Sequence, residues 1–153
     1  MISEKMQKAI NEQINKEFFS AYLYLAMAAY FEHENLPGFA SWMYIQAGEE
    51  KEHGMKFYKH LIDRGGKVEL PSIDSPKSDW KSHLEVFKEV QKHEAQVTAS
   101  INGLYETALQ EKDYPSQMIP LYGVLTVGDS YQITNGSGDP GWTTSYVSNL
   151  STD

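Results

Sequence analysis

The sequence feature that most constrains the fold is a segment without helical periodicity, residues 65–81, that follows a long helical pattern. That pattern begins at Pro37, a residue favoured at the first helical position, and ends at Arg64 before Gly65 and Gly66. A helix of this length is about 42 Å long, and seventeen extended residues reach up to about 56 Å. The segment can therefore run the whole length of the helix and start a third helix parallel to the second, as in a helical bundle with a long crossover.

The sequence predicts two more amphipathic helices, one before Pro37 and one after the segment 65–81. Residues 3–32 repeat apolar side chains at steps of three and four, with Ser3 as the expected N-cap and Leu25 widening the apolar stripe. The short connection that follows predicts an antiparallel return. The third helix begins at the capping box formed by Ser82 and Glu85, and its stripe includes Phe87, Val90, Val97, Ile101, Leu104 or Tyr105, and Ala108. The sequence thus predicts an all-α fold for this part of the chain.

The apolar stripe of each predicted helix is interrupted by a glutamate near its middle. Glu17 lies among apolar residues of the first helix, Glu50 lies with His53 at i, i+3 on the second, and Glu94 lies on the third. An ionised carboxylate that is buried without compensation costs several kcal/mol, so such groups need a partner. Any one of them alone is more often a helix-edge residue that reaches water. Three glutamates at one level, with a Glu-x-x-His pair, favour a site for a hard or borderline metal cation.

Composition excludes several classes of function. The formal net charge of −8 argues against binding to a nucleic-acid backbone and is compatible with attraction of cations. The absence of cysteine excludes disulfides, iron–sulfur clusters and thiolate zinc sites. Neither a signal-peptide pattern nor an apolar run long enough to cross a membrane is present, so we expect a soluble, cytoplasmic protein.

The last part of the chain differs in character from the rest. All thirteen Lys and Arg residues precede Ile119, and no Glu follows it. Residues 121–127, 131–134 and 142–147 are rich in β-forming residues, and several Gly and Pro residues interrupt any helical pattern. We therefore expect a helical domain over residues 1–118 and an atypical segment over residues 119–153 that is β-leaning or disordered.

Residues 1 to about 118 resemble the non-haem ferritins of bacteria and archaea. The resemblance rests on the order and spacing of several short segments and covers about three quarters of the chain. These segments are Asn11-Glu12-Gln13 with Glu17, Ala21-Tyr22-Leu23-Tyr24, Glu49-Glu50 with His53, Lys92-His93-Glu94, and Lys112-Asp113-Tyr114-Pro115.

The resemblance implies a ferroxidase centre that holds two iron ions. By it, Glu17, Glu50 and His53 hold the first iron, and Glu50 bridges to a second iron that Glu94 also ligates. Carboxylates stabilise ferric iron, and two adjacent ferrous ions can deliver two electrons to dioxygen.

The resemblance also implies roles for two residues beside this centre. Tyr24 would lie against it and assist electron transfer, although an ordinary core tyrosine is the alternative. Glu49 matches a ligand of a third, weaker iron site, and a solvated position on the helix face is an equal alternative. The other histidines match no ligand position and are expected at the surface: His33, His60, His83 and His93.

The sequence departs from the family where a fourth, Glu-rich helix would supply the last ligands of the second iron. Val127 and Ser130 stand at those positions. A frameshift is disfavoured, which leaves a chimera, a designed substitution or an alternative terminus. We therefore expect weak binding at the second iron position and an apolar groove that is filled by the tail, filled by another subunit, or left in a loose fold.

Two main functions follow from these observations. The first is a ferritin-type protein that oxidises Fe(II) with dioxygen and stores the ferric mineral, with iron ions and dioxygen as partners. It would form a homo-oligomer, although the missing helix puts the 24-subunit shell of the family in question. The second is a truncated or chimeric ferritin scaffold with an incomplete, inactive iron site. Another di-iron carboxylate enzyme is disfavoured because only one Glu-x-x-His pair is present.

Overall fold

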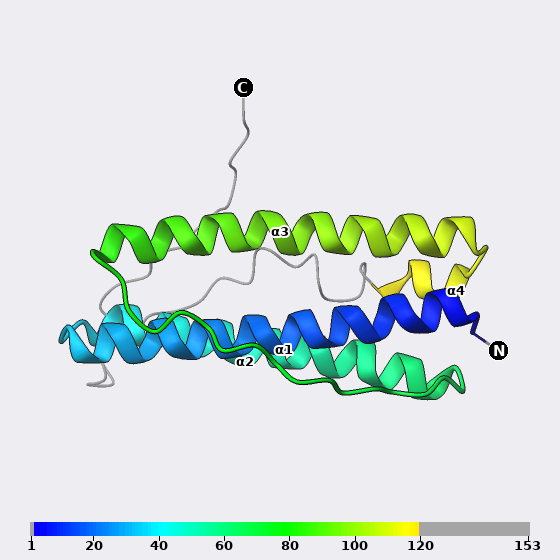
Figure 1. Ribbon diagram of the computed structural model, residues 1–153, viewed down its shortest axis with the longest axis horizontal. Helices are drawn as coiled ribbons and strands as arrows, with labels where there is room; N and C mark the ends of the chain where they lie inside the picture. Colours follow the sequence, from blue (N-terminus) through cyan, green and yellow to red (C-terminus); the bar gives the residue numbers. More distant parts are fainter. Residues whose placement is uncertain (1, 120–153) are drawn as a thin grey trace, which may run out of the picture.

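The computed structural model describes residues 2–119, and among them the regular secondary structure is all helical, without strands (Figure 1). It contains α1 (Glu4–His33), α2 (Pro37–Asp63), α3 (His83–Gln110) and the short α4 (Tyr114–Gln117). The predicted all-α fold is therefore confirmed for this part of the chain. The predicted character of residues 120–153, including Val127 and Ser130, lies outside the described residues.

The helix ends follow the capping signals in the sequence. The Ser3 hydroxyl accepts a hydrogen bond from the Met6 backbone N–H, and the Ser82 hydroxyl accepts one from the Glu85 N–H, as expected of N-caps. The Glu85 carboxylate departs from the capping-box pattern, because it accepts from the Lys81 N–H, one residue before the cap. All three long helices begin and end within one or two residues of the predicted positions.

The long connection between α2 and α3 is the predicted crossover. In Figure 1 the connection is the green trace that crosses α1 and α2 on its way from the end of α2 to the start of α3. As a result, α3 runs parallel to α2. Three amide side chains of α1, spaced four residues apart, hydrogen-bond to its backbone. The bonds are Lys67 N to Gln7 Oε1 at 2.8 Å, Asn11 Nδ2 to Lys67 O at 2.9 Å, Glu69 N to Asn11 Oδ1 at 2.8 Å, and Asn15 Nδ2 to Ser72 O at 3.3 Å.

The core consists of two apolar clusters at opposite ends of the helices. One is built from Leu23, Tyr24, Met27, Ala28, Tyr30, Phe31, Ala40, Met43, Ala47, Trp80, Val86 and Val90. The other is built from Met6, Ile10, Ile14, Phe57, Leu61, Ile101, Leu104, Ala108 and Ile119. Along α1, α2 and α3 alike, the residues between the two clusters include buried polar side chains: Glu17, Ser20, Glu50 and His93. A polar layer therefore divides the apolar core at mid-helix.

Leu25 does not lie where the stripe of the first helix predicts, and α2 and α3 also expose apolar side chains. Leu25 is 45% exposed and does not widen the buried face of α1. Phe39 is 43% exposed, although its ring packs against Phe31 with 5.2 Å between centroids. Of the two alternatives on α3, Leu104 is buried and Tyr105 is exposed. The buried face of each helix is narrower than the apolar stripe in its sequence, because the described helices pack against one another over only part of their circumference.

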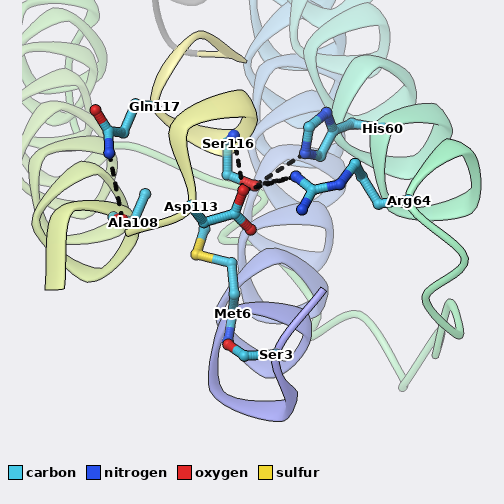
Figure 2. A network of polar contacts seen from close by, with 8 residues as sticks. All are labelled: Ser3, Met6, His60, Arg64, Ala108, Asp113, Ser116 and Gln117. Carbon is cyan, nitrogen blue, oxygen red and sulfur yellow. Dashed lines mark hydrogen bonds and ion pairs between the residues drawn. The ribbon is translucent and has the colours of Figure 1, made fainter. Parts of the chain in front are cut away.

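The turn from α3 into α4 is fixed to the end of α2 by a polar network (Figure 2). The Asp113 carboxylate accepts a hydrogen bond from the Arg64 guanidinium at 2.7 Å and caps α4 through the Ser116 N–H at 3.3 Å. The Ser116 hydroxyl lies 2.9 Å from Nε2 of His60. Although burial acts against ionisation, the bonds from Arg64 and Ser116 hold the pKa of Asp113 below its usual range.

Candidate metal centre

Three of the predicted ligands meet in the polar layer between the apolar clusters. Glu17 of α1 and Glu50 and His53 of α2 each offer one ligand atom, and these atoms lie within 4.8 Å of one another. Both glutamates are buried, and Nδ1 of His53 is 3.8 Å from Oε2 of Glu50. Among the described residues this is the one group of acidic and histidine side chains close enough to share an ion.

One oxygen of each buried glutamate has no hydrogen-bond partner among the described residues. These atoms are Oε2 of Glu17 and Oε2 of Glu50. The other oxygen of Glu17 accepts a hydrogen bond from Nε2 of Gln13 at 2.7 Å. A buried carboxylate oxygen without a partner loses its hydration and gains nothing in exchange. A bound cation would compensate both oxygens for the hydration that they lose on burial, so their environment suits metal ligands.

The burial of the pair has a large electrostatic effect. It raises the pKa of Glu17 to about 8, with the neighbouring Glu50 contributing in the same direction. It also raises the pKa of Glu50 to about 7, helped by the negative charges of Glu94 and Glu49. At neutral pH the empty centre therefore retains protons, and a cation that binds there must displace them.

Glu94 and Glu49 do not belong to the three-residue group. Glu94 of α3 is half-buried, and its Oε1 accepts a hydrogen bond from the Tyr24 hydroxyl. Burial, and after it the charge of Glu94, raises the pKa of the Tyr24 phenol far above its usual value, so it remains a hydrogen-bond donor. Glu49 is half-buried and accepts a hydrogen bond from Gln46 at 2.9 Å.

Tyr24 lies in the core between aromatic neighbours. Its ring meets Trp42 edge-on at 6.4 Å and His93 edge-on at 6.2 Å between centroids. Packing alone therefore accounts for the ring, and the hydrogen bond to Glu94 adds a link from α1 to α3. The predicted roles of Tyr24 and Glu94 remain predictions.

Two histidines predicted at the surface lie elsewhere. His93 is buried, with Nε2 2.8 Å from the Ser20 hydroxyl, and burial lowers its pKa. His60 is half-buried beside Ser116, and burial lowers its pKa as well. The prediction was wrong for both because it asked only whether a histidine matched a ligand position. His33 and His83 are exposed, as predicted.

Two residues that the sequence analysis did not single out shape the centre. Gln13 is 2% exposed and holds one oxygen of Glu17. Gly54 follows His53, and a Cβ atom there would lie 3.0 Å from Cε1 of Phe18 and 3.3 Å from Cβ of Glu17. The sequence contained a signal for each, since Gln13 lies one turn before Glu17 and Gly54 is a small residue on the apolar stripe.

The family assignment follows from comparison with known proteins. A family model described as ferritin-like domain matches residues 7–119. The chain belongs to the ferritin family. This ferritin is 43% identical over 114 residues to a bacterial non-haem ferritin of Staphylococcus aureus. The aligned region covers 74% of this chain and 69% of that protein. A bacterial non-haem ferritin of Bacteroides fragilis is 44% identical over 117 residues, covering 76% of this chain and 74% of that one.

Solved structures agree with this assignment. An open pore ferritin from the archaeon Archaeoglobus fulgidus superposes with a TM-score of 0.78 at 46% identity, covering 80% of this chain and 75% of that chain. The resemblance to bacterial and archaeal non-haem ferritins, predicted from short segments, is thereby confirmed. Among the described residues of this ferritin, no helix is long and apolar enough to cross a membrane.

Proposed function

We propose that this ferritin binds ferrous iron at Glu17, Glu50 and His53 and oxidises it with dioxygen. The observation that carries the proposal is a pair of buried oxygens without a hydrogen-bond partner among the described residues, Oε2 of Glu17 and Oε2 of Glu50. Two carboxylates and an imidazole form a donor set that suits iron, and family membership supports iron over other cations. Iron is here the substrate that enters and leaves the centre.

The chemistry of the ligands fits the oxidation. Each ferrous ion gives up one electron, so two ions supply the two electrons that, together with two protons, reduce dioxygen to hydrogen peroxide. The negative charge of two carboxylates stabilises the ferric product relative to the ferrous substrate. Since burial keeps protons on Glu17 and Glu50, the arriving cation replaces protons and leaves no uncompensated charge in the core.

A second iron would be held by Glu50 together with Glu94. The carboxylate of Glu94 belongs to the third helix of the bundle and is already held by the Tyr24 hydroxyl. Tyr24 would keep Glu94 in place and assist electron transfer, and Glu49 would hold a third, weaker iron. These assignments rest on the resemblance to the family, with the Tyr24–Glu94 hydrogen bond as support.

Storage of the ferric product would require several copies of the chain. We expect assembly into a homo-oligomer, an expectation that rests on membership of the ferritin family. Measurement of the mass in solution tests this expectation. A particle of many subunits supports storage, and a monomer or dimer supports oxidation without storage.

The decisive experiment is aerobic oxidation of ferrous iron at about two ions per chain, followed by absorbance. The wild type is compared with Glu50→Ala and with Glu52→Ala, which removes an exposed carboxylate from the same helix two residues away. Fast oxidation in the wild type and in Glu52→Ala, with loss in Glu50→Ala, supports the centre. Oxidation no faster than buffer in all three proteins would overturn the proposal and favour a scaffold with an inactive iron site.

A further inference from the structure

A continuous chain of hydrogen bonds leads from the surface to the metal centre. Nζ of Lys16 donates to the Ser100 hydroxyl at 2.7 Å, and this hydroxyl donates to Oε1 of Gln13 at 2.7 Å. Nε2 of Gln13 then donates to Oε1 of Glu17 at 2.7 Å. Lys16, Gln13 and Glu17 belong to α1 and Ser100 to α3, so the chain joins these two helices beside the centre.

The Lys16 ammonium determines which atom donates and which accepts in each of these hydrogen bonds. The Lys16 ammonium has only donors, so the Ser100 oxygen must accept from it. The single hydroxyl hydrogen of Ser100 is then free to go to Gln13, which must present its amide oxygen to receive it. The amide NH₂ of Gln13 consequently points to Glu17 and donates to its Oε1.

This series of hydrogen bonds therefore distinguishes the two carboxylate oxygens of Glu17. Oε1 accepts the hydrogen bond from Gln13, whereas Oε2 is buried and has no hydrogen-bond partner among the described residues. We propose that Gln13 is a positioning residue of the iron centre, which reserves Oε2 of Glu17 for the metal and prevents rotation of the carboxylate. Ser100 and Lys16 in turn fix the amide of Gln13. This inference rests on the proposed function, since it assigns a role in binding at the same centre.

The geometry of Gln13 supports such a role over simple packing. A glutamine that is 2% exposed occupies a position where an apolar residue would complete the stripe of α1. Both ends of its amide are bonded, one to α3 and one to the ligand. Side chains that hold a metal ligand in this way change metal affinity by about 10–100-fold when they are replaced.

The test uses Co²⁺ as a spectroscopic probe and the full-length protein without iron. Gln13→Met keeps the length of the side chain and removes both hydrogen bonds. Ser100→Ala removes the bond to the amide oxygen and the bond from Lys16, but leaves the bond from Gln13 to Glu17 in place, and Ser100→Thr restores a hydroxyl at the same position. Glu50→Ala serves as the variant without a centre. Calorimetric titration gives the affinity, the visible absorption of bound Co²⁺ reports its coordination, and thermal unfolding of the metal-free proteins reports the fold.

We expect Gln13→Met to bind Co²⁺ at least tenfold more weakly than the wild type, with an altered visible spectrum. Ser100→Ala should show a smaller loss, of about threefold, that Ser100→Thr restores, while the metal-free unfolding temperature stays within a few degrees. Wild-type affinity and spectrum in Gln13→Met would overturn the inference and leave the centre intact. If Gln13→Met does not fold, equal binding by the two Ser100 variants would overturn it.

The same titration separates this inference from the proposed function. A wild type that binds Co²⁺ no better than Glu50→Ala would overturn the metal centre itself. A wild type that binds well, with Gln13→Met indistinguishable from it, would overturn only the role of Gln13.

Discussion

Gly54 of α2 faces Glu17 of α1 so closely that a Cβ atom added to the glycine would lie 3.3 Å from the Cβ of the glutamate. The same added atom would lie 3.0 Å from Cε1 of Phe18. Gly54 follows His53 directly, so the close approach of the two helices occurs beside the candidate metal centre. A glycine inside a helix costs about 1 kcal/mol relative to alanine, and here the close approach offsets that cost.

Replacing Gly54 by alanine should therefore harm both the fold and the centre. We expect Gly54→Ala to lower the free energy of unfolding by roughly 1–2 kcal/mol, because the forced separation of α1 and α2 outweighs the better helix propensity. Co²⁺ binding should weaken in parallel. Gly48→Ala is the matched control, since its added Cβ meets nothing within 4 Å and should stabilise α2 by up to about 1 kcal/mol. Equal gains in stability from both substitutions would contradict the close approach.

The metal-free protein should lose stability as the pH rises. In the unfolded chain, Glu17 and Glu50 titrate near the ordinary value of 4.5, whereas in the folded chain the pKa values are about 8 and about 7. Between these limits the folded state binds more protons than the unfolded state, so the stability present below pH 4.5 is lost as the pH rises toward 8. Each unit of pKa difference is worth about 1.4 kcal/mol, so we expect the free energy of unfolding to fall by several kcal/mol between about pH 5 and pH 8.5.

Denaturant unfolding across this pH range measures the loss. The control is the double variant Glu17→Gln, Glu50→Gln, which cannot ionise at these positions and should show a much flatter pH dependence. Saturating Co²⁺ should also flatten the wild-type curve, because the cation compensates both carboxylates. Identical slopes for the wild type and the double variant would show that neither glutamate has a raised pKa.

Binding of a divalent cation should release protons near neutral pH. At pH 7 the pKa values of Glu17 and Glu50 predict that the empty centre holds about one proton, which the metal displaces. Titration calorimetry with Co²⁺ in buffers of different ionisation enthalpy gives the number directly. The release should fall toward zero by about pH 9, where both carboxyls have already ionised. A constant proton release across this range would contradict the raised pKa values.

The network at the start of α4 should contribute to stability through both a cap and an ion pair. We expect Asp113→Ala to lower the free energy of unfolding by roughly 2–4 kcal/mol, because it removes the cap and leaves the Arg64 charge without its partner. Asp113→Asn keeps the cap and should lose less. Since the pKa of Asp113 is lowered, this contribution is present above about pH 4 and is lost as the pH falls further. Equal losses in the two variants would contradict the role of the cap.

The fold of the described residues could be predicted because each of its boundaries has a local chemical signal. Ser3 and Ser82 mark helix starts with hydroxyls, Gly65 marks a helix end with a φ of +70°, and residues 65–81 are long enough for a crossover. The glutamate on each stripe could be found because a buried carboxylate breaks a regular apolar repeat. These signals are all contained in short stretches of sequence.

The supporting residues could not be predicted in the same way, because their role depends on contacts between helices. Gln13 is recognisable only once Ser100 of α3 is known to lie beside it, and the burial of His93 only once Ser20 and Tyr24 of α1 are known to face it. Gly54 looked like any small residue until Phe18 and Glu17 were placed opposite. Distances between side chains on different helices depend on the relative rotation of those helices, which periodicity alone does not fix.

The crossover has a consequence for which sequences this fold tolerates. Its attachment uses main-chain atoms of Lys67, Glu69 and Ser72, whereas the side chains belong to α1. The path of the connection is therefore determined by a helix distant in sequence, and the side chains of Lys67, Glu69 and Ser72 can vary while the path is kept, whereas Val68 packs against the apolar cluster at that end. The number of residues between Lys67 and Ser72 is constrained, by contrast. An inserted residue would move one of these backbone groups away from the amide side chain of α1 that it bonds to, because α1 holds that amide in a fixed position.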